Sequence, residues 1–148
     1  MILPKLASNR FTTEEGLRIT VQVPNTHAEK VIQAVCNISP LEYGDYDNVT
    51  FKTSIGVQQF RSLGTGRNPA SPGVVELDTV EISFFLPGDE QKAVQVLETV
   101  YTFHPFEEPV VFVQPCVRTL HINGVDEDNP NKVWNSEKVD WYPEEHQK

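Results

Sequence analysis

The chain has 148 residues, of which 39% are hydrophobic, and its 21 acidic against 12 basic residues give a formal net charge of −9. This length fits one domain with a core of its own, and the composition is typical of a globular protein. The acidic balance and the lack of a basic cluster argue against nucleic acid and anionic membranes as partners, because binding to phosphates requires a positive face.

The apolar stretches are short, and the two cysteines are far apart. A bilayer span needs about 20 apolar residues, and no stretch approaches that length. The opening Met-Ile-Leu-Pro-Lys lacks the basic-then-apolar order of a signal peptide, so we expect a cytoplasmic protein. Cys36 and Cys116 form neither a disulfide framework nor a CxxC metal pair. We expect both cysteines to be small apolar fillers. The alternative, that one thiol lines a site for a soft metal, stays open.

The first elements are a strand and a helix. Apolar and polar residues alternate from 17 to 23, which predicts a half-buried strand that ends at Pro24. Thr26 and Glu29 have the spacing of a pair that caps a helix start. A stripe at three- and four-residue spacing predicts a helix that ends at Pro40. The stripe consists of Ala28, Val31, Ile32, Val35 and Ile38.

Two further strands are predicted next. Residues 49 to 57 alternate in the same way as residues 17 to 23. From Val74 to Leu86 the apolar positions alternate as well, but their parity changes between Leu77 and Val80. Such a change would turn the side chains to the wrong face unless a bulge or bend absorbs it, so we expect a long, bent strand.

A second helix and a last strand region follow. Asp89 and Glu90 suit the positive end of a helix that must stop near His104, because Pro105 follows. The predicted apolar stripe of this helix consists of Ala93, Val94, Leu97, Val100 and Tyr101. The continuous apolar run 110–113 indicates a strand that is covered on both sides or lies at an interface, and a weaker separate strand is predicted over 117–122.

The element order β-α-β-β-α-β plus an extra strand predicts a ferredoxin-like α+β fold with both helices on one face of an antiparallel sheet. We divide the chain into a polar lead-in over 1–16, a folded domain over 17–122 and an acidic tail over 123–148. The tail holds both tryptophans, Trp134 and Trp141. We therefore expect the tail to pack on the body or on a neighbouring subunit.

The connection from 58 to 73 is much longer than a normal hairpin loop. Gly64 and Gly66 allow the backbone to approach a ligand closely. Arg61 and Arg67 concentrate positive charge in an acidic chain. The connection is therefore either a loop that contacts an anion or phosphate, or a projecting arm that packs between subunits.

The second candidate site is His104-Pro105-Phe106-Glu107-Glu108-Pro109. An imidazole with carboxylates could bind a transition metal or transfer protons. However, neighbouring residues of an extended chain point in opposite directions, so Glu107 and Glu108 should not converge on one atom. The alternative is a rigid turn in which His104 caps helix carbonyls and a glutamate binds backbone amides. We expect the turn and leave the metal site open.

A family resemblance follows from three motifs in matching order. The stretch 44–51, Gly64-Thr65-Gly66 and the 104–109 motif together resemble the PII-like domain of the YqfO family. The last motif is also similar to the His-Pro-Tyr-Glu-x-Pro stretch of CutA divalent-cation-tolerance proteins. The resemblance covers roughly residues 17 to 115. It implies a PII/CutA-like fold, commonly trimeric, that binds small molecules or metals at subunit clefts.

The resemblance maps onto this chain with some departures. His104 and Glu107 match the shared motif, and Gly64 and Gly66 match the glycine loop. Arg67, Asn68 and Ser71 stand where the family usually has an aromatic residue and more glycine. The histidine- and carboxylate-rich metal centre of larger YqfO-type proteins is absent from the sequence, so hydrolase activity should not be transferred.

The expected function is a non-enzymatic binding module that assembles with itself, as a trimer or another homo-oligomer, and takes a small anionic metabolite or a divalent metal ion. The expected ligand-binding residues are Arg61, Gly64, Gly66, Arg67, His104 and Glu107, with His104 and Glu107 as metal ligands. One alternative is a partner-docking protein that uses the acidic tail. Another is a small enzyme that uses His104 with a nearby glutamate.

Overall fold

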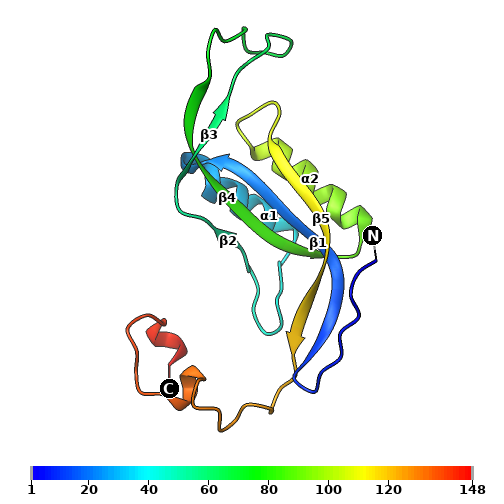
Figure 1. Cartoon of the computed structure of the whole chain (residues 1–148), viewed down its shortest axis with the longest axis vertical. Helices are drawn as coiled ribbons and strands as arrows, with labels where there is room; N and C mark the ends of the chain where they lie inside the picture. The colour runs from blue at the N-terminus through cyan, green and yellow to red at the C-terminus, as the bar shows by residue number, and fades with distance from the viewer. Residues whose placement is uncertain (1, 148) are drawn as a thin grey trace.

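The computed structural model describes residues 2–147 and contains one antiparallel sheet with two helices behind it (Figure 1). The hydrogen-bonded order of the sheet is β2-β4-β1-β5, and β3 also pairs with β4. The elements are β1 (Phe11–Pro24), η1 (Asn25–His27), α1 (Ala28–Ile38), β2 (Phe51–Lys52), β3 (Gly56–Phe60), β4 (Val75–Pro87), α2 (Glu90–Phe103), β5 (Val110–His121), η2 (Val133–Asn135) and η3 (Glu144–His146). The predicted ferredoxin-like α+β fold is confirmed.

The core lies between the sheet and the helices. Alternate residues of β1 and β4 are buried, and the two strands pair so that Val21 lies opposite Ile82. Burying a side chain of this size stabilises the fold by roughly 1.5–3 kcal/mol. The helices contribute Ala28, Val31, Val35, Ala93, Val96 and Val100.

The predicted stripe of α2 was wrong at two positions. Val94 and Tyr101 are 54% and 55% exposed, and Val96 is buried in their place. A helix with apolar residues on two sides does not reveal from its spacing alone which side faces the sheet.

The start of β1 and the course of β5 differ from the prediction. β1 begins at Phe11, so the end of the polar lead-in placed at residue 16 falls inside a strand. Phe11 pairs with His121, and β5 runs as a single strand where a short strand and a separate weaker one were expected. The alternation of β1 was missed at its start because Thr12 to Glu15 are polar on both faces.

The region predicted as one strand over 49–57 is broken in two. Three residues, Thr53 to Ile55, lie opposite only two residues of β4, Val80 and Glu81. The Thr53 amide donates to the Glu81 carbonyl, and the Glu81 amide donates to the Thr53 hydroxyl, both at 2.9 Å. This bulge lies where the parity of β4 changes, so the expected bend is present.

The two helix starts differ. The predicted Thr26–Glu29 capping pair is wrong: η1 precedes α1, and the Thr26 hydroxyl lies 2.9 Å from His27 Nδ1. At α2, Asp89 caps the first turn by accepting a hydrogen bond from the Lys92 amide at 3.2 Å. Its negative charge also suits the positive helix end. No helix in residues 2–147 is long and apolar enough to cross a membrane.

The face of the sheet away from the helices is open. Register places Phe51, Ser83, Thr20 and Phe112 in one row across four strands on this face. Phe51 and Phe112 are 67% and 52% exposed. The expectation that the run 110–113 is covered on both sides is therefore wrong within one protomer. The alternative, that this run lies at an interface with another copy, stays open. Pro115 lies in the middle of β5, at the edge of the sheet where a missing amide donor is tolerated.

Candidate functional site

The connection between β3 and β4 projects from the sheet as an arm, residues 61–74 (Figure 1). Ser62 holds its tip together: the hydroxyl donates to the Asn68 carbonyl at 3.1 Å and accepts from the Gly64 amide at 3.2 Å. Gly64 has a φ of +82°, a conformation that favours glycine. The arm therefore has a defined shape of its own.

The His-Pro turn, residues 104–109, is fixed by the imidazole of His104, which is 6% exposed. His104 Nε2 lies 2.7 Å from the Gln22 carbonyl and donates to it, while Nδ1 accepts from the Phe106 amide at 3.1 Å. Burial lowers the pKa of His104, which favours the neutral ring that these two bonds require. His104 thus ties the turn to β1. It also caps α2 as we expected, but through its backbone amide, which donates to the Val100 carbonyl at 2.9 Å, and not through its imidazole.

The arm and the His-Pro turn meet. The Arg67 amide donates to Glu107 Oε1 at 3.3 Å, and Arg67 Nε lies 3.4 Å from Glu107 Oε2. A Cβ on Gly66 would lie 2.7 Å from Glu107 Oε1 and 3.7 Å from Glu108 Oε2, so only glycine fits here without a shift. We call Gly66, Arg67, Glu107 and Glu108 the arm–turn junction. The expectation that Glu107 and Glu108 do not converge on one atom assumed an extended chain, whereas the chain bends over 104–108 and both carboxylates approach Gly66.

The polar groups of the junction are open to solvent. The side chains of Arg67 and Glu107 are 87% and 48% exposed, and an ion pair with this exposure contributes at most about 1 kcal/mol. An incoming ligand can therefore separate the pair at little cost. Carboxylate oxygens suit a hard divalent cation, and the guanidinium suits a phosphate or carboxylate.

The structure brings some predicted site residues together and leaves others apart. Gly66, Arg67 and Glu107 share the junction, whereas Gly64 shapes the arm and Arg61 is exposed at its base. His104 would have to give up a backbone hydrogen bond before it could ligate a metal. Across residues 2–147, no group of three or more His, Cys, Asp or Glu side chains is placed to hold a metal ion.

Sequence reasoning missed Arg118, which organises the other end of the sheet. Its guanidinium carbon lies 4.0 Å from the Phe85 ring centre and 4.7 Å from that of Tyr43. It also pairs with Glu14 Oε1 at 2.6 Å and donates to the Glu42 carbonyl at 2.8 Å. With 11% of the side chain exposed, Arg118 is a structural residue. Its partners come from β1, from β4 and from the loop between α1 and β2, so no local spacing could reveal them.

The ferredoxin-like fold of this chain is shared with CutA proteins. CutA from Xylella fastidiosa is similar in structure with a TM-score of 0.50 at 11% identity, over 66% of this chain and 80% of that chain. CutA from Synechococcus elongatus PCC7942 is similar with a TM-score of 0.51 at 16% identity, over 72% of this chain and 85% of that chain.

The similarity extends to one particular protein at higher identity. A Bacillus cereus protein related to NIF3 has a TM-score of 0.58 and 28% identity over 76% of this chain. This chain covers only 28% of the length of that protein, so it corresponds to one part of a larger chain. No protein-family model matches this chain, and no curated protein does.

Proposed function

We propose that the protein is a non-enzymatic binding module of the PII/CutA type that associates with copies of itself and binds its ligand at the arm–turn junction. The observation that carries this proposal is the contact of Arg67 and Gly66 with Glu107. Two motifs far apart in sequence, both part of the resemblance to the YqfO-type domain, meet in one exposed cluster of charges. The ligand is a divalent cation or a small anionic metabolite.

Self-association is supported by surfaces that a single copy leaves uncovered. The open face of the sheet carries Phe51 and Phe112, both more than half exposed. The strand next to the arm adds Val57, which is 58% exposed. Apolar area of this kind on a sheet face and its edge gains free energy when another copy covers it. The resemblance to CutA and PII-like domains favours a trimer.

The two ligand classes use different atoms. A cation would be held by the carboxylates of Glu107 and Glu108, with Arg67 displaced outward. An anion would be held by the guanidinium of Arg67, with Arg61 from the same arm as a second positive charge. A non-enzymatic role is supported by His104, whose two ring nitrogens are both engaged, and by the thiols of Cys36 and Cys116, whose pKa values burial raises.

The test combines light scattering with a melting-temperature screen. We expect an oligomer, and an increase in Tm with Mg²⁺, Mn²⁺ or Cu²⁺ for a cation site, or with phosphate and nucleotides for an anion site. The double variant Glu107→Gln/Glu108→Gln should abolish the metal response, and Arg67→Gln the anion response. Glu98→Gln, an exposed acid on α2, is the matched control. A monomer whose Tm responds to neither class would refute the proposal.

A second function, partner docking through the tail, is favoured by the exposure of Trp134 and Trp141, 49% and 71%. Residues with this much apolar area are common anchors of protein interfaces. Deletion of residues 123–148 should then abolish capture of the partner and leave the fold intact. Capture that survives the deletion would count against this function.

A further inference from the structure

The tail lies at the end of the molecule opposite the arm (Figure 1). A cleft of about 720 Å³ is formed between the tail and the residues at the ends of β1 and β5. This volume falls within the range of small-molecule sites, about 300–1,000 Å³. The body contributes Arg10, Tyr46, His121 and Ile122 to its lining, and the tail contributes the remainder. We call this space the tail cleft. It shares no residue with the arm–turn junction.

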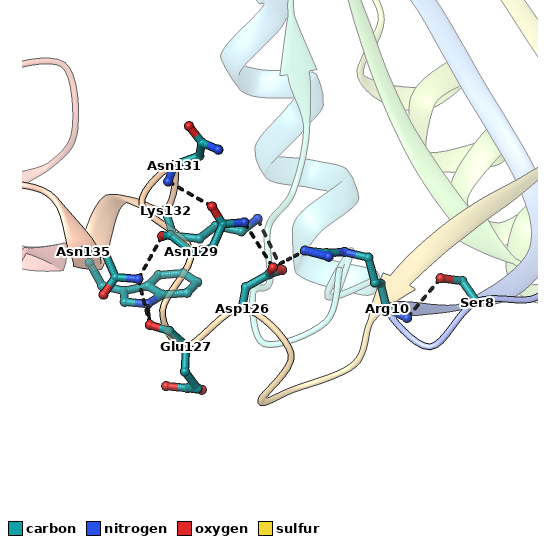
Figure 2. A network of polar contacts seen from close by, with 9 residues as sticks. Ser8, Arg10, Asp126, Glu127, Asn129, Asn131, Lys132 and Asn135 are labelled. Atoms are coloured by element: carbon teal, nitrogen blue, oxygen red, sulfur yellow. Dashed lines mark hydrogen bonds and ion pairs between the residues drawn. The ribbon is translucent and has the colours of Figure 1, made fainter.

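The lining of the tail cleft is more positive than the chain as a whole. Three cations, Arg10, Lys132 and Lys138, and two carboxylates, Asp126 and Glu127, line the cleft of a protein with a net charge of −9. Lys138 is already paired with Glu144 at 3.2 Å. Asp126 pairs with Arg10 and lies 3.8 Å from Lys132, so one carboxylate is shared by two cations (Figure 2). Lys132 is therefore only weakly paired, and its side chain is 41% exposed.

The cleft also carries aromatic surface. Tyr46, Trp134 and Tyr142 line it, and Trp134 remains 49% exposed. The Trp134 indole N–H is directed to the Glu127 carbonyl at 3.4 Å, which orients the ring. Aromatic side chains next to a cation are suited to a planar ring that bears a negative charge.

The walls of the cleft are held by side-chain hydrogen bonds. Asn135 Nδ2 donates to the carbonyls of Glu127 and Asn129 at 2.7 and 2.8 Å (Figure 2). Gln147 accepts from the Val139 amide at 2.9 Å and donates to the Tyr142 carbonyl at 2.8 Å. These bonds fix the backbone of the tail around the cleft although the tail lacks an apolar core of its own.

We propose that the tail cleft binds a small molecule that combines a planar aromatic ring with a phosphate or carboxylate group. Lys132 contacts the anionic group, and Trp134 stacks on the ring. The ligand bridges body and tail, because Arg10 and Tyr46 belong to one and Lys132 and Trp134 to the other. Binding should therefore also order the tail against the body.

The experiment is a titration of the full chain with adenosine monophosphate, with indole-3-acetate and with inorganic phosphate, followed by calorimetry and by tryptophan fluorescence. We expect saturable binding of one of the two aromatic anions with a change in fluorescence, and binding at least roughly tenfold weaker for phosphate alone. Which of the two binds distinguishes a phosphate from a carboxylate end. Phosphate binding as tightly as both aromatic anions would overturn the assignment of an aromatic subsite, and with it the proposal.

Three variants make the assignment specific. Lys132→Gln should weaken binding roughly fivefold or more, because it removes the cation that Asp126 holds only at 3.8 Å. Lys30→Gln, an exposed lysine on α1, should bind as the parent chain does. Trp134→Phe should bind with a smaller fluorescence change, since a phenyl ring can still stack. Equal affinity of Lys132→Gln and the parent, or the absence of saturation by any probe at about 10 mM, would overturn the proposal.

Discussion

The body of the protein and its C-terminal tail are stabilised in different ways. In the body, the side chains of β1, β4 and the two helices form one continuous apolar core. Between residues 123 and 147, no side chain is buried, and the segment is held by asparagine and glutamine side chains bonded to backbone carbonyls. Both regions have a defined conformation, but only the body is held by the burial of apolar area.

This difference determines how each region should respond to change. Apolar burial is distributed over many residues and is lost only when the body unfolds as a unit. Exposed hydrogen bonds contribute little net free energy each, about 1 kcal/mol, and can open locally. A folded frame with a loosely held appendage is well suited to a ligand that orders the appendage on binding.

The largest effect should come from the core. Ile82→Ala removes a side chain that is 1% exposed at the centre of β4, and we expect a loss of about 2–5 kcal/mol in the free energy of unfolding. Val94→Ala, on the exposed side of α2, should change the same quantity by no more than about 0.5 kcal/mol. Urea unfolding followed by circular dichroism measures both. Similar losses in the two variants would show that the packing described for α2 is wrong.

Gly16→Ala tests how closely β1 and β4 approach. A Cβ at Gly16 would overlap the carbonyl oxygen of Leu86 and the ring of Phe85. The strands must then shift, at a cost of about 1–3 kcal/mol. Gly73→Ala, which places its Cβ in open space, is the matched control and should leave the midpoint of urea unfolding nearly unchanged. An unaffected Gly16→Ala protein would contradict the register of this strand pair.

His104 should make the stability of the body depend on pH. Because burial holds its folded pKa below the ordinary 6.5, the unfolded chain binds the proton more tightly. Its contribution is complete above about pH 6.5 and is lost as the pH falls below that value toward the folded pKa. The free energy of unfolding, measured from pH 5 to 8, should fall on the acid side, and His104→Gln should flatten this fall.

His104→Gln should also cost about 1–3 kcal/mol at pH 8, since glutamine cannot satisfy both backbone groups. His121→Gln, at an exposed position near the tail, should not cause this loss at pH 8. A pH profile of His104→Gln that matches the parent would assign the acid sensitivity to another group.

Removal of the tail should have the smallest effect on the body. Deletion of residues 123–148 eliminates the exposed Arg10–Asp126 pair but no core contact, so we expect a loss of no more than about 1 kcal/mol in the free energy of unfolding. Urea unfolding of the truncated chain is the measurement. A loss as large as that of Ile82→Ala would mean that body and tail form one cooperative unit.

The sequence predicted the body better than the tail or the site. Alternation over 17–23 and 74–86 revealed the central strands because one face of each is buried and the other is not. The start of β1 could not be found in this way, since Thr12 to Glu15 are polar on both faces. The bulge at Thr53 was visible only as a change of parity in the strand opposite to it.

The candidate site was predicted in its parts but not in its geometry. The glycine loop and the His-Pro motif were separate candidates, and the contact between Arg67 and Glu107 depends on the bend of β4 that directs the arm. The tail cleft had no sequence signal at all. Its lining combines Arg10, Tyr46, the end of β5 and residues of the tail, which are far apart in the sequence and come together only in the folded chain.

Pro115 makes the two edges of the sheet differ in their ability to pair with a further strand. A strand that docks alongside β5 would find no amide donor in the middle of its partner, because proline has none to offer. β3 at the opposite edge contains no proline and ends at the arm. Copies that join strand to strand should therefore meet through the β2–β3 edge, so that each new neighbour arrives beside Glu107 and the arm. Growth of the sheet in both directions, the route to an open-ended fibre, is thereby hindered.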